Sequence, residues 1–279
     1  MIKHNILAGG MYYILLAFFL QSCAATRPAA EKNSFTFIQL TDPQIGFNTE
    51  PGKDSLLYVQ AVTAVNRLRP DFVVITGDLI HHTGDSAELA AFRTITARIS
   101  PDIPVYYLPG NHDVGNTPAP DDIARYKSLY GYDRFLFVHK RTRFIGINTS
   151  LLKAGPAPLE AEQWSWLKKA LAKPQRYPRT IVFGHYPFFI ADPAEAETAY
   201  NLPPGLRRQY LALLKEQGVE VIFAGHYHRN GYGKDGTLEM VTTGAVGKPL
   251  GKDPSGFRLV TVGSNGVQHE YRALSPAGR

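Results

Sequence analysis

The sequence predicts an α/β domain whose core contains more than one β-sheet. From residue 35 onward, short apolar runs alternate with longer stretches of helical periodicity, as in parallel strands connected by helices. From residue 237 the chain contains only strand-like runs separated by Gly-rich turns. The chain has 279 residues, 44% of them hydrophobic and 19% charged, which is enough for one large core or two modest ones.

The first half of this domain alternates between strands and helices. Apolar runs rich in β-branched and aromatic residues predict the strands, and amphipathic periodicity predicts the helices. The predicted strands lie at 35–41, 72–76, 105–109, 134–140 and 143–150, and the predicted helices at 54–69, 86–99 and 123–130. The last two strands are close enough along the chain to form a hairpin.

The second half repeats the alternation and then ends in strands. Helices are predicted at 159–172 and 204–217, and strands at 179–185, 219–226, 237–243, 256–262 and 267–274. No internal repeat and no interdomain linker is visible, so we predict a single domain over residues 35–275.

Residues 1–22 have the pattern of a secretory signal peptide. An apolar run at 6–20 follows Lys3, and it is shorter than the ~20 residues that a membrane-spanning helix needs. Leu20, Gln21, Ser22 and Cys23 resemble the lipobox of a bacterial lipoprotein, in which the cysteine is lipid-modified and begins the mature protein. The alternative is an uncleaved membrane anchor. We expect an exported protein anchored to the membrane through Cys23, on the periplasmic or cell-surface side of a bacterial envelope.

The composition argues against cysteine chemistry and against nucleic-acid binding. Cys23 is the only cysteine, so no disulfide, metal thiolate or thiol nucleophile is expected in the domain. The small, polar, Pro-containing segment 23–34 predicts a tether.

Lys and Arg number 30 against 24 Asp and Glu, a formal charge of +6, but these charges are scattered along the sequence. We therefore expect no nucleic-acid partner, and a monomer.

Polar side chains that can bind metal follow five of the predicted strands. They are Asp42 and Gln44, Asp78, Asn111 and His112, His185, and finally His226 and His228. The carboxyl ends of strands in α/β sheets line one crevice, where ligands bind. Singly, each residue has an ordinary alternative, such as a helix cap, a turn former or a core histidine. Their recurrence at equivalent positions favours a common site.

Glycines accompany four of these five strand ends. Asp78, Asn111, His185 and His226 each follow a glycine directly, and we expect the glycines to let the chain turn sharply and present the next side chain. Asp, Asn and His without Cys suit two borderline-to-hard divalent ions rather than a structural zinc. The histidines of the His226-x-His228 pair would then be divided, one to each metal.

The ordered motifs D-x-(H/Q), GD, GNH(D/E), GH and GHxH resemble those of the calcineurin-like metallophosphoesterases. The resemblance implies a four-layer αββα sandwich with a dinuclear metal site at the carboxyl ends of the strands. It would give one metal Asp42, Gln44 and His228, the other Asn111, His185 and His226, with Asp78 bridging both. His112 would bind the phosphate or protonate the leaving oxygen, and Asp113 would orient His112.

A branch of this family that contains vertebrate Ser/Thr phosphatases is similar beyond the ligand motifs. The shared stretches are TDPQIG, GDLIH, GNHDVGNTP, GHYHRN and GKDPSGFRLV. They add Asn116, Thr117, Arg229, Asn230 and Arg258, which would either contact substrate or serve packing. His81 and His82 follow Asp78 closely enough to reach the crevice. Tyr186 and Tyr227 would stack on a substrate or form its wall.

Gln44 departs from the common motif, in which most relatives have histidine. An amide oxygen is a harder and weaker donor than imidazole, which favours Mn²⁺ or Mg²⁺ over zinc, with iron also possible. A similar Gln appears in the ADP-ribose/CDP-alcohol diphosphatase branch, so Gln44 does not indicate an inactive site.

The resemblance implies a hydrolase that cleaves phosphoesters, most simply phosphomonoesters, through a hydroxide bridging two metals. Substrates would be phosphorylated small molecules or phosphoproteins, although export from the cytoplasm argues against the latter. Three alternatives stay open: a nucleotide-diphosphate diphosphatase, a phosphodiesterase, and a non-catalytic metal-binding surface lipoprotein.

Overall fold

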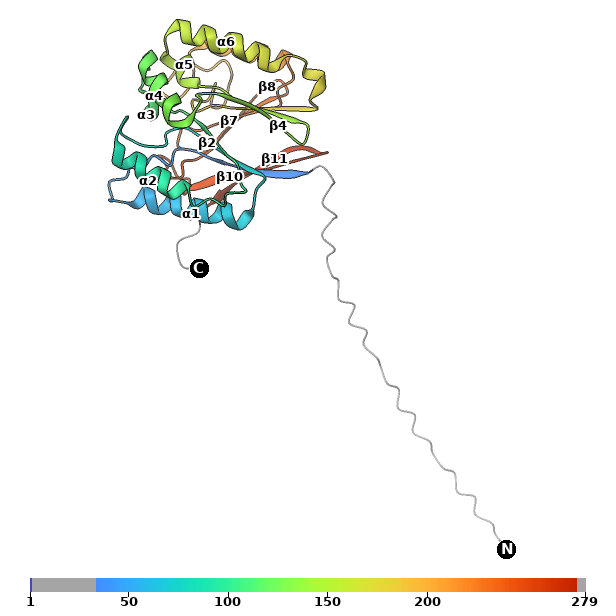
Figure 1. The fold of residues 1–279 in the computed structure, drawn as a ribbon. Helices are drawn as coiled ribbons and strands as arrows, with labels where there is room; N and C mark the ends of the chain where they lie inside the picture. Colours follow the sequence, from blue (N-terminus) through green and yellow to red (C-terminus); the bar gives the residue numbers. More distant parts are fainter. Residues whose placement is uncertain (2–33, 275–279) are drawn as a thin grey trace. The chain divides into compact units, whose positions relative to one another are not determined.

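A computed structural model describes residue 1 and residues 34–274 of the chain. The predicted signal peptide and tether, except for Met1 and Ser34, lie outside the described residues and stay predictions. Among the residues that are described, no helix is long and apolar enough to cross a membrane. The domain that follows contains two β-sheets with helices on their outer faces, which is the predicted four-layer α/β arrangement (Figure 1).

The first sheet has the order β11-β10-β1-β2-β3. Its strands are β1 (Phe35–Leu40), β2 (Phe72–Thr76), β3 (Val105–Leu108), β10 (Gly256–Gly263) and β11 (Gly266–Ala273). β1, β2 and β3 are parallel, with Ile38 opposite Val73, whereas β10 runs antiparallel to β1, with Arg258 opposite Gln39. The loops after β1 and β2 therefore leave the same edge of the sheet.

The second sheet has the order β4-β5-β6-β7-β9-β8. Its strands are β4 (Phe135–His139), β5 (Thr142–Gly146), β6 (Arg179–Phe183), β7 (Val221–Ala224), β8 (Gly231–Asp235) and β9 (Leu238–Thr242). The central four, β5, β6, β7 and β9, are parallel, and antiparallel β4 and β8 close the edges. Here too the loops after β6 and β7 leave one edge together.

A cluster of aromatic side chains fills the space between the sheets. Phe37 of β1 lies 5.7 Å from the ring of Phe183 and 5.9 Å from that of Phe223, both edge-to-face. The neighbouring Ile38 and Leu40 belong instead to the cluster that includes the helices. Strand alternation thus gives each sheet two apolar faces, and each buried Phe contributes about 1.5–3 kcal/mol through its transfer from water.

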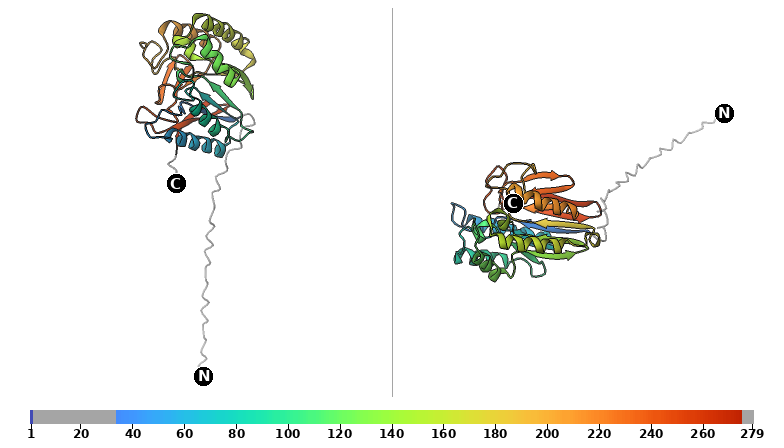
Figure 2. Two further views of the ribbon diagram at one scale, coloured as in Figure 1. Left: turned by 60° about the vertical axis from the view of Figure 1, so that its left-hand side comes forward. Right: turned by 90° about the horizontal axis from the view of Figure 1, so that it is seen from above.

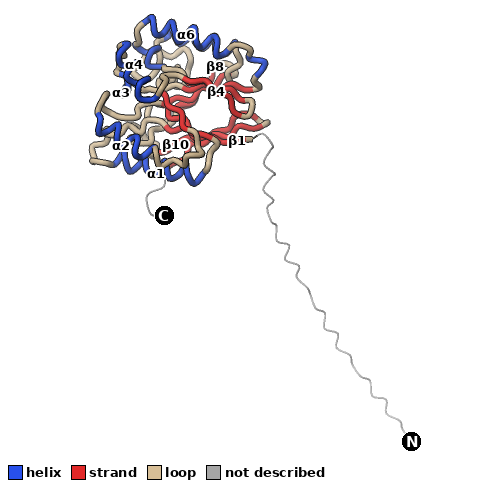
Figure 3. Tube along the Cα trace, viewed as in Figure 1, coloured by secondary structure: helices blue, strands red, loops and turns tan. Residues whose placement is uncertain are grey.

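The helices form the two outer layers. α1 (Lys53–Leu68) and α2 (Ser86–Thr96) lie on the first sheet, and α5 (Thr149–Ala154) and α6 (Ala157–Leu171) on the second (Figures 1 and 2). The remaining helices are α3 (Asn111–Val114), α4 (Pro120–Tyr130), α7 (Pro204–Glu216) and the short 3₁₀ helix η1 (Pro174–Arg176). Figure 3 shows the strands enclosed between helices above and below.

The structure differs from the predicted elements at two places that matter for the site. The predicted strand 143–150 ends at Gly146, and α5 begins at Thr149 because the Asn148 side chain accepts a hydrogen bond from Ser150 N–H. β8 was not predicted, since GYGKD has no apolar alternation. It forms by backbone pairing with β9, with Tyr232 opposite Val241.

Candidate metal centre

The loops after β1 and β2 run side by side beyond the ends of their strands. Asp42 N–H donates to the Gly77 carbonyl (3.2 Å), and Gln44 N–H donates to the Asp78 carbonyl (2.9 Å). The parallel pairing is thereby carried into the loops, so Asp42 and Asp78 leave the sheet at neighbouring points. Both carboxylates are buried, with at most 1% of either residue exposed.

Five of the predicted ligand residues have a left-handed backbone. The φ angles are 49° for Asp42, 40° for Gln44, 49° for Asp78, 62° for His226 and 53° for His228. For a residue with a Cβ this conformation costs about 1–2 kcal/mol, and such strain concentrates at functional sites. The sharply turned backbone also explains how two histidines separated by one residue reach the same region.

The glycines of the motifs serve mainly close packing rather than turning, contrary to our expectation. Of the four, only Gly77 has a positive φ, of 92°. A Cβ on Gly110 would lie 2.1 Å from Asp78 Oδ1, and one on Gly77 would lie 2.6 Å from His185 Nδ1. The absent side chains therefore let the loops approach one another until their ligand atoms meet.

Two groups of side chains have their potential ligand atoms within 4.8 Å of one another. Asp78, His185 and His226 form one group, and Asp42, Asp78 and His228 form the other, so Asp78 belongs to both. His185 Nε2 lies 3.3 Å from Asp78 Oδ2 and 3.1 Å from Asn111 Oδ1. We call Asp42, Gln44 and His228 the Gln44 side, and Asn111, His185 and His226 the Asn111 side.

Each of the three histidines in these groups is held by a backbone carbonyl at one ring nitrogen. His185 Nδ1 lies 2.8 Å from the Thr76 carbonyl, His226 Nε2 lies 3.0 Å from that of Ala199, and His228 Nδ1 lies 2.6 Å from that of Lys248. A carbonyl only accepts, so these nitrogens are the protonated ones. The other nitrogens of His185 and His228 lie 3.3 Å from Asp78 and Asp42 carboxylate oxygens, and that of His226 lies 3.2 Å from His185 Nε2. Metal-binding histidines in proteins are oriented in this way.

Gln44 provides a test of whether the residues fit a metal. Its side-chain Oε1 is buried and has no hydrogen-bond partner among the described residues. An unpaired buried carbonyl oxygen costs about 1–3 kcal/mol, which a cation ligated there would offset. The oxygen and nitrogen donors around it include no thiolate, the donor set of a hard or borderline divalent ion. The site therefore fits the ions that its motifs imply.

The carboxylates and histidines shift one another's pKa values. Burial raises the pKa of Asp42, but His228 and His185 outweigh this and lower it, and His185 likewise lowers the pKa of Asp78 despite burial. Burial lowers the pKa of His185, but Asp78 raises it to about 9. Burial and the charge on His185 lower the pKa of His226 to about 4. A metal would compete with a proton at His185, because only neutral imidazole binds metal.

Comparison with known proteins gives the family of the chain. The model of the calcineurin-like phosphoesterase family matches residues 35–230. A serine/threonine-protein phosphatase CPPED1 of Danio rerio is 34% identical over 264 residues, 86% of this chain and 85% of its own. The bovine CPPED1 is 32% identical over 96% of this chain and 92% of its own.

The chain belongs to the calcineurin-like phosphoesterase family. It is a metal-dependent hydrolase of phosphoesters, and the family's site holds two divalent metals. Solved structures share the fold. A dimetal phosphatase from Danio rerio has a TM-score of 0.59 at 19% identity, covering 86% of this chain and 99% of its own. A purple acid phosphatase from yellow lupin has a TM-score of 0.63 at 18% identity, covering 88% and 52%.

In this phosphoesterase His112 lies beside the carboxylates, but Asp113 does not orient it as we predicted. His112 N–H donates to Asp78 Oδ1 (2.9 Å), and His112 Nδ1 donates to the carbonyl of His81 (2.6 Å). The Asp113 carboxylate instead accepts from the backbone N–H groups of Gly110 and Leu79. Burial and the Asp78 charge raise the Asp113 pKa to about 8. The Asp113 carboxylate thus links the loop after β2 to the loop after β3. The group that orients the His112 ring is the His81 carbonyl.

Asn116, for which the sequence left substrate contact or packing open, contacts a predicted ligand. Its Oδ1 accepts a hydrogen bond from Asn111 Nδ2 (2.9 Å), which leaves Asn111 Oδ1 directed to His185. Since an amide presents different atoms on its two sides, this contact decides which atom of Asn111 faces the cluster.

The sequence left substrate contact and packing open for Arg258 and Asn230, and the contacts of both residues in the structure are packing contacts. Arg258 is 6% exposed and donates to Thr243 Oγ1 (2.8 Å) and to Asn230 Oδ1 (2.7 Å). It thereby links β10 of the first sheet to the end of the second. Arg229 is different, since it is half-buried, donates to the Leu250 carbonyl (2.9 Å) and lies over the Tyr227 ring. Of these three, only Arg229 bonds a main-chain carbonyl of the loop after β9 and stacks on a ring next to the ligand histidines.

The rings of His81 and Phe47 lie against the Gln44 side. The sequence left the role of His81 open and did not single out Phe47. The His81 ring stacks on Phe47 and on His112, with centroids 4.7 Å apart in each pair. Lys248 Nζ lies 4.4 Å from the Phe47 ring centre. The signal for His81 was its place three residues after Asp78, whereas nothing in the motif marked Phe47. His82 is exposed and pairs with Glu88.

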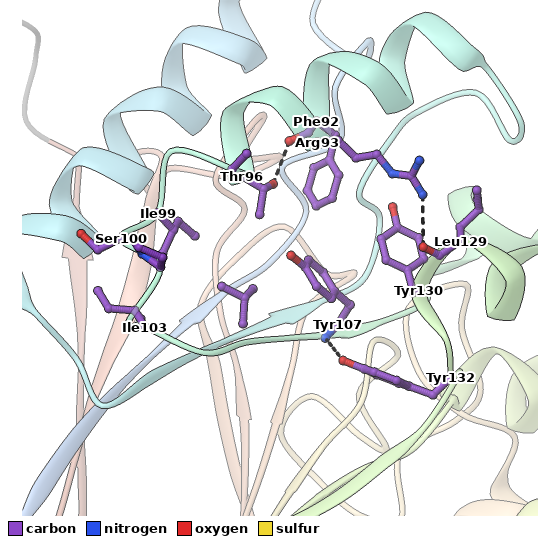
Figure 4. Close-up of a pocket in the computed structure, with 13 residues that line it drawn as sticks. Phe92, Arg93, Thr96, Ile99, Ser100, Ile103, Tyr107, Leu129, Tyr130 and Tyr132 are labelled. Carbon is purple, nitrogen blue, oxygen red and sulfur yellow. Dashed lines mark hydrogen bonds between the residues drawn. The ribbon is translucent and has the colours of Figure 1, made fainter.

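A separate cavity of about 590 Å³ lies between α2, β3 and the end of α4 (Figure 4). Phe92, Tyr107, Tyr130 and Tyr132 line it, and Tyr132 OH accepts a hydrogen bond from Tyr107 N–H on edge strand β3. None of the predicted ligand residues lines this cavity. This cavity is therefore separate from the candidate metal centre at the strand ends.

Proposed function

We propose that this chain hydrolyses phosphomonoesters, with the Gln44 side holding one divalent ion, the Asn111 side the other, and Asp78 shared by both. The observation that supports this most directly is the membership of Asp78 in both ligand groups. The buried, partnerless Gln44 Oε1 supports the same arrangement on the first side.

The side chains around the ions would each have a defined part in the reaction. When bound, two divalent ions act as Lewis acids that activate water and neutralise charge on a phosphoryl group. His112 donates from Nδ1 to a backbone carbonyl, so its Nε2 is the nitrogen left to contact the phosphate, and when Nε2 is protonated as well it can pass that proton to the leaving oxygen. Arg229 keeps guanidinium N–H groups that can donate to phosphate oxygens.

The native ions are proposed to be Mn²⁺. The Gln44 side presents two oxygen donors, Asp42 and Gln44, and one imidazole nitrogen, His228, with no sulfur. Such a set favours Mn²⁺ or Mg²⁺ over softer ions, and an amide holds them more weakly than imidazole does.

A second candidate is hydrolysis of nucleotide diphosphates. Tyr200 and Tyr227 pack edge-to-face at 5.2 Å, and Tyr200 lies 6.1 Å from the ring of His226. A nucleobase can stack on such exposed aromatic surface next to a phosphate site. The CPPED1 relatives are named serine/threonine-protein phosphatases, which supports a phosphomonoester as the first candidate.

A panel of substrates with the purified domain and Mn²⁺ separates these functions. We expect p-nitrophenyl phosphate and phosphoserine peptides to be hydrolysed faster than bis-p-nitrophenyl phosphate and ADP-ribose. Faster turnover of ADP-ribose, lost on replacing Tyr200 by Ala, would favour the diphosphatase. Asp78→Asn is the negative control for all four substrates.

For the location we propose an exported protein attached to a membrane through a lipid on Cys23. The support is the segment Leu20, Gln21, Ser22 and Cys23 after an apolar run. In a bacterial host fed radioactive palmitate, the full chain should be labelled and Cys23→Ala should not. Absence of label in the unaltered chain contradicts the proposal.

A further inference from the structure

The amide of Gln44 has two possible orientations, and only one of them suits a metal. Its oxygen can ligate a cation, whereas its NH₂ group only donates hydrogen bonds. The histidine of the common D-x-H motif would not present this choice. In this chain some neighbouring group has to decide which end of the amide faces Asp42 and His228.

The group in contact with the other end of this amide is His81. Gln44 Nε2 donates to His81 Nδ1 at 3.3 Å, and this leaves Gln44 Oε1 buried without a partner among the described residues. Because Nε2 is a donor, His81 Nδ1 has to be the unprotonated, accepting nitrogen. An accepting atom at this place would repel the amide oxygen and so disfavour the reversed orientation.

The His81 ring is itself fixed. It is stacked between Phe47 and His112, with centroid separations of 4.7 Å and interplanar angles of 24° and 23°. Its backbone N–H donates to the Ile45 carbonyl (2.9 Å) and to Glu88 Oε2 (3.0 Å). The accepting nitrogen is therefore held in place by packing on both ring faces and by the two hydrogen bonds that the His81 main-chain N–H donates.

From these contacts we propose that His81 is a positioning residue of the metal centre, which fixes the Gln44 amide with its oxygen toward the ion of the Gln44 side. The inference rests on the proposed function, since it needs an ion at that side. His81 acts through Gln44 and does not itself bind the metal. On the Asn111 side the corresponding work is done by Asn116, which accepts from Asn111 Nδ2 (2.9 Å).

The test replaces the nitrogen while keeping the ring. His81→Phe retains a planar ring between Phe47 and His112 and retains the backbone contacts, but it removes the acceptor. His81→Asn removes most of the ring but places an accepting Oδ1 near the former Nδ1. His82→Phe, at the exposed neighbouring residue, is the matched control. Circular dichroism and thermal unfolding establish that each purified variant is folded.

The readout is Mn²⁺ binding to metal-stripped protein by isothermal titration calorimetry. The unaltered chain and His82→Phe should bind two ions. In His81→Phe one of the two sites should weaken by about 10–100-fold, the usual effect of losing a residue that orients a ligand, and His81→Asn should restore most of the affinity.

Unchanged binding in His81→Phe overturns the role of His81 and leaves the proposed function intact. Equal weakening in His81→Phe and His81→Asn also overturns it, because the accepting atom would then be irrelevant. If the unaltered chain binds no Mn²⁺ at either site, the proposed metal centre fails, and the inference fails with it.

Discussion

The Asn111 side and the Gln44 side of the centre use the same kinds of atoms but differ in how the protein holds them. On the Asn111 side the amide oxygen Asn111 Oδ1 lies 3.1 Å from His185 Nε2, so a proton on that nitrogen satisfies the oxygen as long as no ion is bound. On the Gln44 side the amide oxygen has none among the described residues. Without an ion the protein can therefore satisfy the amide oxygen of one side, whereas the amide oxygen of the other side stays unpaired until a cation binds.

This difference suggests a division of labour between the two positions. On the Asn111 side an ion has to displace the proton on His185 Nε2, whereas the Gln44 side depends on the ion for part of its stability. The two sides meet at Asp78, so a change there affects both. Variants of Asp78, of one side alone or of a single ligand atom should therefore have distinguishable effects on metal binding and activity.

The largest effect is expected for Asp78→Asn. The substitution keeps the size of the side chain but removes the charge that both ligand groups share, so both ions should be lost and activity should fall to background. Asp42→Asn, which alters one group only, should retain one ion. Elemental analysis after dialysis measures the metal content. Two ions bound to Asp78→Asn would remove Asp78 from the centre.

Gly110→Ala should have nearly the same effect without altering a ligand. The new Cβ would lie 2.1 Å from Asp78 Oδ1, so the Asp78 carboxylate or the loop carrying Asn111 has to shift. We expect reduced metal content and a lower melting temperature. Gly205→Ala, in α7, is the control because a Cβ there meets nothing within 4 Å. Equal behaviour of the two variants would show that the loops can separate at little cost.

His112→Ala should reduce turnover much more than metal binding. His112 contacts Asp78 through its backbone N–H, which alanine keeps, whereas its ring is the group available to substrate. Loss of an acid–base or phosphate-binding group should lower kcat by about 10²–10⁴-fold. Metal content is measured on the same sample. Loss of both ions would mean that the ring belongs to the ligand set, whereas weakening of one site alone is the effect expected from losing its contact with the His81 ring.

These residues also show what could be predicted from the sequence. The strands, most helices and the strand-end residues followed from apolar periodicity and from motifs whose spacing is local. Contacts between loops did not, because Asn116 with Asn111, Asp113 with Gly110 and Leu79, and Arg258 with Asn230 depend on side-chain directions that periodicity does not encode. Similarity of a stretch to relatives indicated that these residues matter, but it could not separate substrate contact from support of the site.

Asn116→Ala should loosen the Asn111 side selectively. Without the Asn116 acceptor the Asn111 amide can reverse, so one of the two Mn²⁺ affinities should fall by about 10–100-fold. Asn116→Asp keeps an acceptor and should bind nearly normally. Calorimetric titration of metal-stripped protein measures both sites. If the two variants bind alike, the contact does not orient Asn111.

The smallest and most specific effect is expected for Gln44→His, which gives the Gln44 side the histidine of the common D-x-H motif. Imidazole is a softer and stronger donor than an amide oxygen, so the variant should hold its ion more tightly and shift its preference from Mn²⁺ toward zinc or iron. Activity need not rise with affinity, because tighter binding in the resting site gives no advantage unless the transition state gains more.

Titrating activity and metal content of the metal-stripped proteins with Mn²⁺ and Zn²⁺ tests this directly. We expect only one of the two binding steps to change, since the Asn111 side keeps all of its contacts. This result would show that the two sides bind their ions separately. If both steps change together, the sides are coupled through Asp78 more strongly than their separate contacts indicate. Identical curves for Gln44→His and the unaltered chain would show that residue 44 ligates neither ion, and the buried Gln44 Oε1 would then need another partner.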